Sequence, residues 1–420
     1  MNSVLDFYIQ ENKRQIPHEF NSAFLKNLRS HGQKDLANIE IPTRKNDDWK
    51  YTNLTNTLEN KYDLQQTSPP QINLHEDDKY HHIYFSNGIL HEIEDTDFPF
   101  SLIPISQAHQ TDFFEKMESE NYFKNDFNTI FNWAHLNQGY FFIFNKNTSI
   151  DKPIMVHHFF AGESSLQNIT NFFIIEDGAK VSLIENFHSQ NKLAVNLATH
   201  VHVCKNAHFE HVQVQDIQYD GLFLNNLNSY VKRDANYNNI IINTGAKTCR
   251  GNLLLDLLET GAHGACHGLY ALHRNQHCDT MSYIKHTSEH TTSEQLYKGI
   301  LTDESRGVFT GRVRVDRDAQ QINATQLNKN LLISKKAQAY SRPQMEIYAD
   351  DVKCAHGSTT GQLSEDELFY FEARGIRKDK ARQILARGFA YDVVLKINSP
   401  QIQSSVKEHL LQKHIVSDQC

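Results

Sequence analysis

One short turn recurs through the middle of this 420-residue chain and limits the folds that it can adopt. A Gly, Asn, Asp or similar turn residue is followed by an alanine, and the first three of these alanines lie 28 residues apart. These alanines are Ala179, Ala207, Ala235, Ala246, Ala262 and Ala319. Between the turns, short runs of Phe, Ile, Val and Leu alternate with polar residues, as in β-strands. A repeated turn with a strand on each side is typical of a solenoid.

The strand pattern persists for about 200 residues with almost no helical periodicity. Parallel strands need long crossovers unless the sheet coils on itself. We therefore predict a mainly β protein with a parallel β-helix over 140–362, built mostly of strands shorter than about eight residues. A large β-sandwich is the alternative. An N-terminal helical and mixed domain over 1–139 and a C-terminal helical domain over 363–420 flank the predicted β-helix.

Composition excludes several classes of protein. The net charge of −8 gives no general basic field that would attract nucleic acid or an anionic membrane. No apolar run approaches the roughly 20 residues that cross a bilayer, and the N-terminus lacks the apolar core of a signal peptide. Six cysteines in so long a chain do not indicate a disulfide framework. We therefore expect a cytoplasmic protein in a reducing compartment. Neither a P-loop nor a dinucleotide-binding Gly-rich motif is present.

The stretch Arg342–Gly361 contains side chains that can bind a metal or a substrate. Met345, Ile347 and Ala349 alternate with polar residues and predict a strand with one buried face. The following pair Asp350–Asp351 predicts a tight turn. Because the segment Gln344–Gly357 lies near the end of the strand region, we expect it at a subunit edge, where an in-chain neighbour is missing on one side.

After that turn, Val352, Cys354 and His356 fall on one face of the next strand. A thiol and an imidazole that point the same way can share a metal or a substrate. The spacing alone leaves a second interpretation open, in which both side chains are structural. Gly357 removes a side chain next to His356, which predicts room for a facing subunit.

Two other groups of residues have alternative interpretations. The histidines and cysteines of 263–278 suggest a metal site, but Cys-x2-Cys spacing is missing, so strand residues alternating in and out are favoured. These residues are Cys266, His267, His273, His277 and Cys278. Asp316 and Asp318 could be the paired carboxylates of a carbohydrate-active β-helix enzyme. The simpler interpretation is a solvated turn.

The C-terminal part is predicted to be helical from a capping box at Ser364–Glu367 onward. An apolar stripe follows in the second of these helices, formed by Ala381, Ile384, Leu385 and Phe389. Such helices can cap the end of a solenoid. Alternatively, the stripe is a docking surface for a partner.

Several blocks between Ala319 and Val394 resemble the SufD branch of the SufB/SufD family of iron–sulfur cluster assembly proteins. They read AQQINATQLNKNLLIS, RPQMEIYADDVKCAHGSTTG, FYFEARGI and ARGFAYDVV. A weaker similarity covers PTRKNDDWKYT at 42–52. Lys-Cys-Ala-His-Gly stands where SufB chains carry a His-Glu pair, which favours the SufD branch.

The resemblance implies a right-handed parallel β-helix and a non-catalytic scaffold subunit. It implies a SufB-like partner, a SufC-like ABC ATPase that docks on the C-terminal helices and hydrolyses the ATP, and apo iron–sulfur proteins as acceptors. A transient iron–sulfur cluster would form at the interface with the SufB-like partner, with His356 as its ligand and Cys354 as a weaker candidate. The resemblance also allows a reduced flavin bound by the complex. A bare β-helix edge is a ready pairing surface, so the chain alone can form a homodimer, and the sequence leaves its oligomeric state open.

Overall fold

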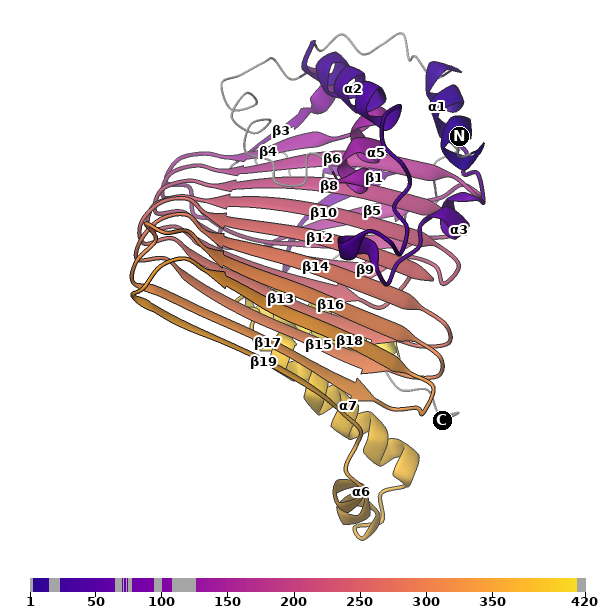
Figure 1. Ribbon diagram of the computed structural model, residues 1–420, viewed down its shortest axis with the longest axis vertical. Helices are drawn as coiled ribbons and strands as arrows, with labels where there is room; N and C mark the ends of the chain where they lie inside the picture. The colour runs from indigo at the N-terminus through magenta and orange to yellow at the C-terminus, as the bar shows by residue number, and fades with distance from the viewer. Residues whose placement is uncertain are drawn as a thin grey trace.

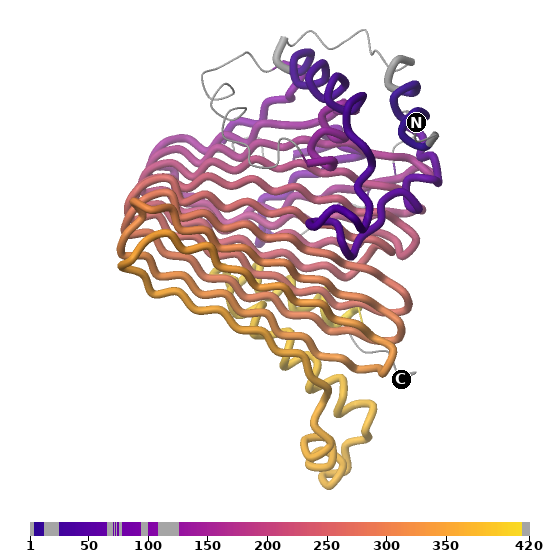
Figure 2. Tube along the Cα trace, in the orientation of Figure 1, coloured from indigo at the N-terminus to yellow at the C-terminus, as the bar shows by residue number. Residues whose placement is uncertain are grey.

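The computed structural model describes residues 3–14, 23–64, 70, 72, 74, 78–93, 100–107 and 126–413. Its strands form two sheets, and from β4 onward successive strands of the chain alternate between them (Figure 1). The odd sheet has the order β19-β17-β15-β13-β11-β9-β7-β5-β1-β2. The even sheet has the order β18-β16-β14-β12-β10-β8-β6-β4-β3. The chain thus coils through one strand of each sheet per turn, for about eight turns (Figure 2).

The elements have the following bounds. The helices are α1 (Ser3–Arg14), α2 (Ala23–Leu36), η1 (Asp47–Trp49), α3 (Thr55–Leu58), η2 (Ile105–Gln107), α5 (Phe127–Ala134), α6 (Glu365–Glu372), α7 (Lys378–Val394) and α8 (Pro400–Gln412). The strands up to the fifth turn are β1 (His81–Ser86), β2 (Ile89–Ile93), β3 (Phe100–Pro104), β4 (Tyr140–Phe144), β5 (Ile154–Phe160), β6 (Leu166–Ile175), β7 (Lys180–Ser189), β8 (Ala194–Val203), β9 (His208–Asp216), β10 (Leu222–Val231), β11 (Asn236–Asn243), β12 (Thr248–Leu257) and β13 (His263–Leu272). The remaining strands are β14 (His277–His286), β15 (Thr292–Leu301), β16 (Arg306–Val315), β17 (Ile322–Leu332), β18 (Gln338–Ile347) and β19 (Val352–Gly361).

The predicted parallel β-helix is confirmed, because neighbouring strands from β4 to β19 pair in parallel and in register. The prediction of short strands is wrong, since most strands of the solenoid have 10 residues. Polar residues inside the strands, such as Asn196 and Asn226, resemble breaks in the sequence, yet both are fully buried. Strands that are covered on both faces lose the simple alternation of apolar and polar residues. The solenoid also begins before residue 140, because β1 pairs in parallel with β5.

The recurring turn has a plain physical basis. The residue before the alanine has a positive φ at Gly178 (73°), Asn206 (56°) and Asp234 (56°). Glycine reaches this left-handed region without a Cβ clash, and Asn and Asp tolerate it better than other residues. The following Ala179 and Ala207 are fully buried, so a small methyl group fills the narrow corner between the two sheets. The corner at which the chain passes from the even sheet to the odd sheet is therefore marked by Ala179, Ala207, Ala235, Ala262 and Ala319. Ala246 lies at the opposite corner, between β11 and β12, and has a positive φ itself (56°).

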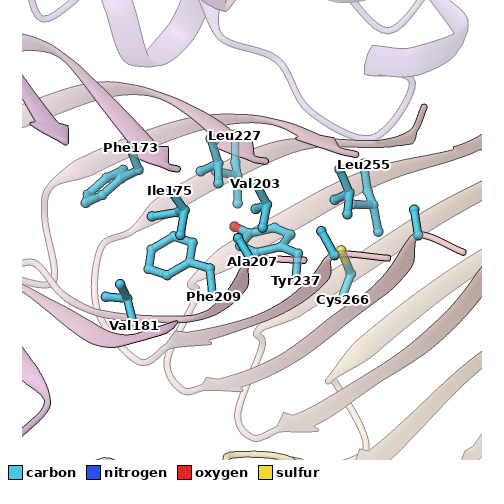
Figure 3. Packing of buried hydrophobic residues seen from close by; sticks show 14 of the residues in the cluster. Phe173, Ile175, Val181, Val203, Ala207, Phe209, Leu227, Tyr237, Leu255 and Cys266 are labelled. Carbon is cyan, nitrogen blue, oxygen red and sulfur yellow. The ribbon is translucent and has the colours of Figure 1, made fainter. Parts of the chain in front are cut away.

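Alternate residues of each strand point between the sheets and form a continuous core (Figure 3). Aromatic rings from successive turns stack along this core: the ring centroids of Phe173 and Phe209 are 5.8 Å apart, and those of Phe209 and Tyr237 are 5.7 Å apart. Such pairs add attraction beyond the apolar area they bury. The stacked core holds the turns in register and so fixes the position of the last turn.

The N-terminal segments lie on the outer face of the even sheet. Buried residues of α1, α3 and α5 form one apolar cluster with Leu222 and Leu224 of β10. Further along the sheet, the guanidinium of Arg250 lies 4.6 Å from the ring centroid of Trp49 and pairs with Asp279 at 2.7 Å. Thr52 bonds the same Asp279 carboxylate at 2.5 Å. Because Arg250 is almost fully buried, this ion pair ties the segment around η1 firmly to the solenoid.

The C-terminal helices lie on the outer face of the odd sheet. Val393 of α7 and Val406 of α8 pack in one cluster with Val212, Ile240 and Leu269 of the sheet. The helix α6 contacts α7 and projects past the last turn (Figure 1). The helices therefore cover a side of the solenoid instead of capping its end. No helix in the described part of the chain has both the length and the apolarity to cross a membrane.

Candidate functional site

The last turn of the solenoid forms an open edge. The strands β18 and β19 each end a sheet, so each has a neighbouring strand on one side only, β16 and β17 respectively. Their outer backbone N–H and C=O groups have no strand partner within the described residues. This confirms the predicted edge position of Gln344–Gly357. Such an edge is a template for strands of another chain.

His356 points inward from this edge and yet reaches solvent. Val352, Cys354 and His356 share a face, as predicted, because their register partners on β17 are all buried. The partner of His356 is Gln326, which is 2% exposed. His356 itself is exposed, because no later strand covers the inward face of β19. The imidazole thus occupies the open end of the solenoid interior, where a facing subunit could reach it.

Cys354 is more enclosed than His356. It is partly buried, packs against the interior core cluster and lies in register with the buried Ala324. Burial raises the pKa of the Cys354 thiol, and the hydrogen bond from the backbone of Ala324 offsets part of this effect. A raised pKa keeps the thiol protonated, whereas iron binds the thiolate. Of the two candidate ligands, His356 is therefore the more accessible one.

Two details near His356 differ from the predictions. A Cβ at Gly357 would lie 3.2 Å from Leu327 Cδ1, so this glycine fits the chain's own neighbouring strand and leaves the approach to His356 unaffected. The predicted buried face of β18 is wrong at Ile347, which is 38% exposed, although Ala349 beyond the strand is buried. Ile347 is exposed because no following turn covers the inward face of β18.

The residues of 263–278 do not converge. Cys266 and His267 are adjacent on β13 of the odd sheet, whereas His277 and Cys278 belong to β14 of the even sheet. His277 bonds Thr52 at 2.8 Å on the outer face, and Cys266 lies in the interior core cluster. The side chains alternate in and out of the solenoid, as the favoured interpretation predicts. Across the described ranges, no three His, Cys, Asp or Glu side chains are grouped to hold a metal ion.

Asp316 and Asp318 are the carboxylates that a carbohydrate-active enzyme would use, and one of them already has partners within the chain. Asp316 accepts a hydrogen bond from Arg314 at 2.8 Å and lies 3.6 Å from Lys285. Asp318 is exposed on the turn that precedes the buried Ala319. Arg314 and Lys285 each lie against one of the two oxygens of the Asp316 carboxylate, so both oxygens already have partners within the chain. The turn interpretation of this pair therefore fits the contacts better.

The sequence analysis missed a buried carboxylate in the solenoid interior. Glu185 accepts hydrogen bonds from His158 at 3.0 Å and from His211 at 2.7 Å, and Gln213 donates to it at 3.0 Å. Burial alone raises the pKa of Glu185, but the hydrogen bonds and charges of the two histidines outweigh burial and leave that pKa well below its usual range. The only signal in the sequence is that these polar residues share the inward parity of successive turns. We interpret the group as a hydrogen-bonded polar layer of the core.

The C-terminal apolar stripe is divided between two environments. Ala381 is fully buried and Phe389 is partly buried against the cluster under α7, 4.0 Å from the ammonium of Lys298. Leu385 is half-buried, whereas Ile384 is 36% exposed. The buried members therefore stabilise this chain's own fold. The larger exposed apolar surface lies on α6, where Phe369 is 70% and Tyr370 55% exposed; neither was predicted.

Comparisons with known proteins agree on one family. The SufBD core domain of the SUF system for FeS cluster assembly matches residues 158–389, and the SufBD protein N-terminal region matches residues 2–81. An iron–sulfur cluster assembly SufBD family protein of Synechocystis is 26% identical over 414 residues, which cover 92% of this chain and 90% of that protein. The iron–sulfur cluster assembly protein SufD of Escherichia coli is 28% identical over 274 residues, which cover 62% of this chain and 63% of that protein. The chloroplastic protein ABCI7 of Arabidopsis thaliana is 30% identical over 273 residues, which cover 62% of this chain and 57% of that protein.

By its fold, the protein is a two-sheet β-solenoid. Its last turn is open and presents an imidazole. The matched core domain covers more than half of the chain. The chain belongs to the SufBD family of SUF-system iron–sulfur cluster assembly proteins, as the sequence resemblance predicts.

Proposed function

We propose that the chain is the SufD-like subunit of an iron–sulfur cluster assembly complex, paired with a SufB-like subunit and a SufC-like ABC ATPase. The observation that carries the proposal is His356, an exposed imidazole on the inward face of a terminal strand that is paired on one side only. In this role the chain is a scaffold without catalysis of its own, and the ATPase hydrolyses ATP. The described cysteines are free thiols, which suits a reducing, cytoplasmic compartment.

The chemistry of the nascent cluster, as cargo of the complex, supports this role. Iron in such clusters is held mainly by thiolates, and imidazole can replace a thiolate as ligand. Imidazole in its neutral form is a common ligand of iron. We expect such a site to release its cluster to apo iron–sulfur proteins more readily than an all-thiolate site. His356 is the proposed ligand, and Cys354 remains a second candidate.

The open edge provides the surface for the SufB-like subunit. Adding strands of a second solenoid to β18 and β19 would satisfy their outer backbone groups and extend both sheets. It would also bring residues of that subunit over the inward face of β19, where His356 lies. Without this partner, we propose that two copies of the chain pair through the same edge in a two-fold, self-complementary contact.

The projecting pair of α6 and the start of α7 provides the surface for the ATPase. Phe369 and Tyr370 are the most exposed aromatic residues there, and Arg374 lies 3.5 Å from the ring centroid of Tyr370. Ile384 adds an exposed apolar side chain on α7. Aromatic and arginine side chains often dominate binding energy at interfaces. We therefore propose that the ATPase docks on this surface, while Ala381 and Phe389 support it from within.

Three variants of β19 test the proposal in a complex reconstituted with the two partners. His356→Ala should assemble with its partners and abolish cluster formation, because the exposed imidazole makes no hydrogen bond with the described residues. His356→Cys should retain part of the activity, since a thiolate also binds iron. Cys354→Ser should lose less than His356→Ala. The readouts are the absorbance of the assembled cluster and the melting temperature, which should move by only a few degrees.

Thr359→Ala is the matched control, because Thr359 is exposed on the same strand and faces outward. It should leave cluster formation unchanged. Full cluster assembly by a well-folded complex that contains His356→Ala would remove this residue from the mechanism. Equal losses of activity and stability in all variants would instead support a structural role for the strand.

A further inference from the structure

A row of hydrogen-bonded amides runs through the last turns of the solenoid interior. Gln326 Nε2 on β17 donates to Gln295 Oε1 on β15 at 2.7 Å. Gln295 Nε2 in turn donates to Ser282 Oγ on β14. All three residues are at most 2% exposed. Each amide donates toward the earlier turn, so the row has a direction and its acceptor end lies at the last turn.

The acceptor at that end is Gln326 Oε1, which is buried and has no hydrogen-bond partner. An unsatisfied buried carbonyl costs about 1–3 kcal/mol, so a donor near it would be stabilising. The bond to Gln295 occupies Nε2 on the side of the earlier turn, so Oε1 is the amide atom left for a further partner. Gly311 makes room for this amide, since a Cβ there would lie 2.4 Å from Gln326 Nε2.

The strand next to Gln326 on the open side is β19. The register between β17 and β19 shows which residue of β19 could donate a hydrogen bond to Gln326 Oε1. His356 is in register with Gln326, whereas Cys354 lies over Ala324 and Ser358 over Asn328. The Ser358 hydroxyl already donates to Ser341 Oγ at 2.8 Å. His356 is thus the residue of β19 that lies in register with Gln326, and its ring can supply an N–H donor.

We infer that Gln326 is a positioning residue for His356: the exposed imidazole, which makes no hydrogen bond with the residues that the structure describes, turns so that one ring N–H donates to the unpartnered Gln326 Oε1. This bond selects the tautomer and leaves the other nitrogen facing outward. The inference rests on the proposed function, in which that outward nitrogen binds iron. A histidine that binds a metal usually donates its other N–H to such a partner, and losing the partner lowers metal affinity about 10–100-fold. The row from Ser282 keeps the amide from flipping, so it would hold the imidazole ready before the cluster forms.

The first test measures the tautomer of His356 in the full chain without partners. Histidine is labelled with ¹⁵N, and the signals of His356 are assigned by their loss in His356→Ala. At a pH where the ring is neutral, we expect one tautomer to dominate in the unaltered chain. Gln326→Leu removes the acceptor and should give a mixture of tautomers. Gln326→Met keeps the side-chain length and serves as a second apolar variant if leucine lowers stability.

Two further variants separate positioning from packing. Gln326→Glu keeps an acceptor oxygen and should restore the dominant tautomer. Thr325→Val is the matched control, because Thr325 is the exposed neighbour on the outward face of the same strand, and it should change nothing. Equal tautomer populations in the unaltered chain and in both folded apolar variants would overturn the inference.

The second test uses the reconstituted complex with Fe²⁺ as the probe. Gln326→Leu should weaken iron binding about 10–100-fold, and Gln326→Glu should recover most of it. The two tests fail in different ways. If the tautomer responds to Gln326 but His356→Ala still assembles clusters, the proposed function fails and the positioning stands. If the tautomer does not respond, the positioning is wrong whatever His356 does.

Discussion

Acidification from pH 7 to pH 5 should destabilise the folded chain strongly, because burial holds a set of histidines neutral. Burial lowers their pKa to about 4 in five cases and to about 3 in two. The first group is His135, His267, His277, His286 and His409, and the second is His200 and His202. In the unfolded chain a histidine titrates near pH 6.5. Between these pH values the unfolded state therefore binds more protons than the folded state.

The size of the effect follows from this difference in bound protons. One histidine whose pKa falls from about 6.5 to about 4 on folding lowers the free energy of unfolding by about 1.4 kcal/mol per pH unit in that window. From pH 7 to pH 5 this is about 1.9 kcal/mol, so seven such groups amount to roughly 13 kcal/mol. Burial raises the pKa of Asp126 and Asp256, which opposes the trend, but these are only two groups. The lowered pKa of Glu185 matters only below about pH 4.5.

Urea unfolding followed by far-UV circular dichroism at pH 7, 6 and 5 measures this loss. We expect most of the folding free energy, typically about 5–15 kcal/mol, to disappear by pH 5. His286→Gln isolates one histidine, because His286 is fully buried and bonds only the hydroxyls of Thr291 and Ser293, at 2.8 and 2.9 Å. In this variant the free energy of unfolding should fall less steeply on acidification, by about 1.4 kcal/mol per pH unit.

The control for this experiment is His91→Gln, which removes an exposed imidazole from β2. In this control, the free energy of unfolding should change with pH as steeply as in the unaltered chain. Equal free energies of unfolding at pH 7 and pH 5 would refute the reasoning. An unchanged slope in His286→Gln would show that this imidazole is protonated alike in both states.

Two further predictions concern the C-terminal helices. Lys298→Met removes an ammonium that donates to the Phe389 carbonyl at 2.9 Å and pairs with Asp392, so amide exchange at the end of α7 should accelerate about tenfold or more. Lys329→Met, in register on β17, is the control, and unchanged exchange in Lys298→Met would contradict the prediction. Phe369→Ser should weaken ATPase binding about tenfold or more without loss of stability, because Phe369 is 70% exposed. Leu395→Ser, at a residue 63% exposed, should bind normally; equal binding by Phe369→Ser would argue against this docking surface.

Local patterns predicted much of the architecture. The turn that ends in Ala179 and Ala207 is set by a left-handed residue and a corner too narrow for a larger side chain, and both constraints are visible in a few residues. The shared face of Cys354 and His356 follows from the period of two in a strand. These features depend on neighbours in sequence, which is why sequence reasoning reached them.

Features that depend on distant neighbours were not predictable. Whether Ala381 faces a partner or the chain's own core is decided by its fully buried position in the fold, which periodicity does not reveal. The hydrogen bonds of Glu185 come from strands one turn away on each side. Asn196 and Asn226 resemble loop residues until helices and neighbouring turns cover them. The open end is equally a property of the stack, since the exposure of His356 comes from the absence of a later strand over its inward face.

The attachment of α7 also constrains how the length of such a chain can vary in evolution. α7 is fixed to β13 and β15, through Lys298 and through Lys396 with Glu294, and it carries α6 beyond β19 (Figure 1). Insertion of one whole turn after β15 would move His356 by about 4.8 Å relative to α6. A turn inserted before β9 would leave that distance unchanged. Relatives should therefore gain or lose turns in the first half of the solenoid and keep the number of turns after β15 constant.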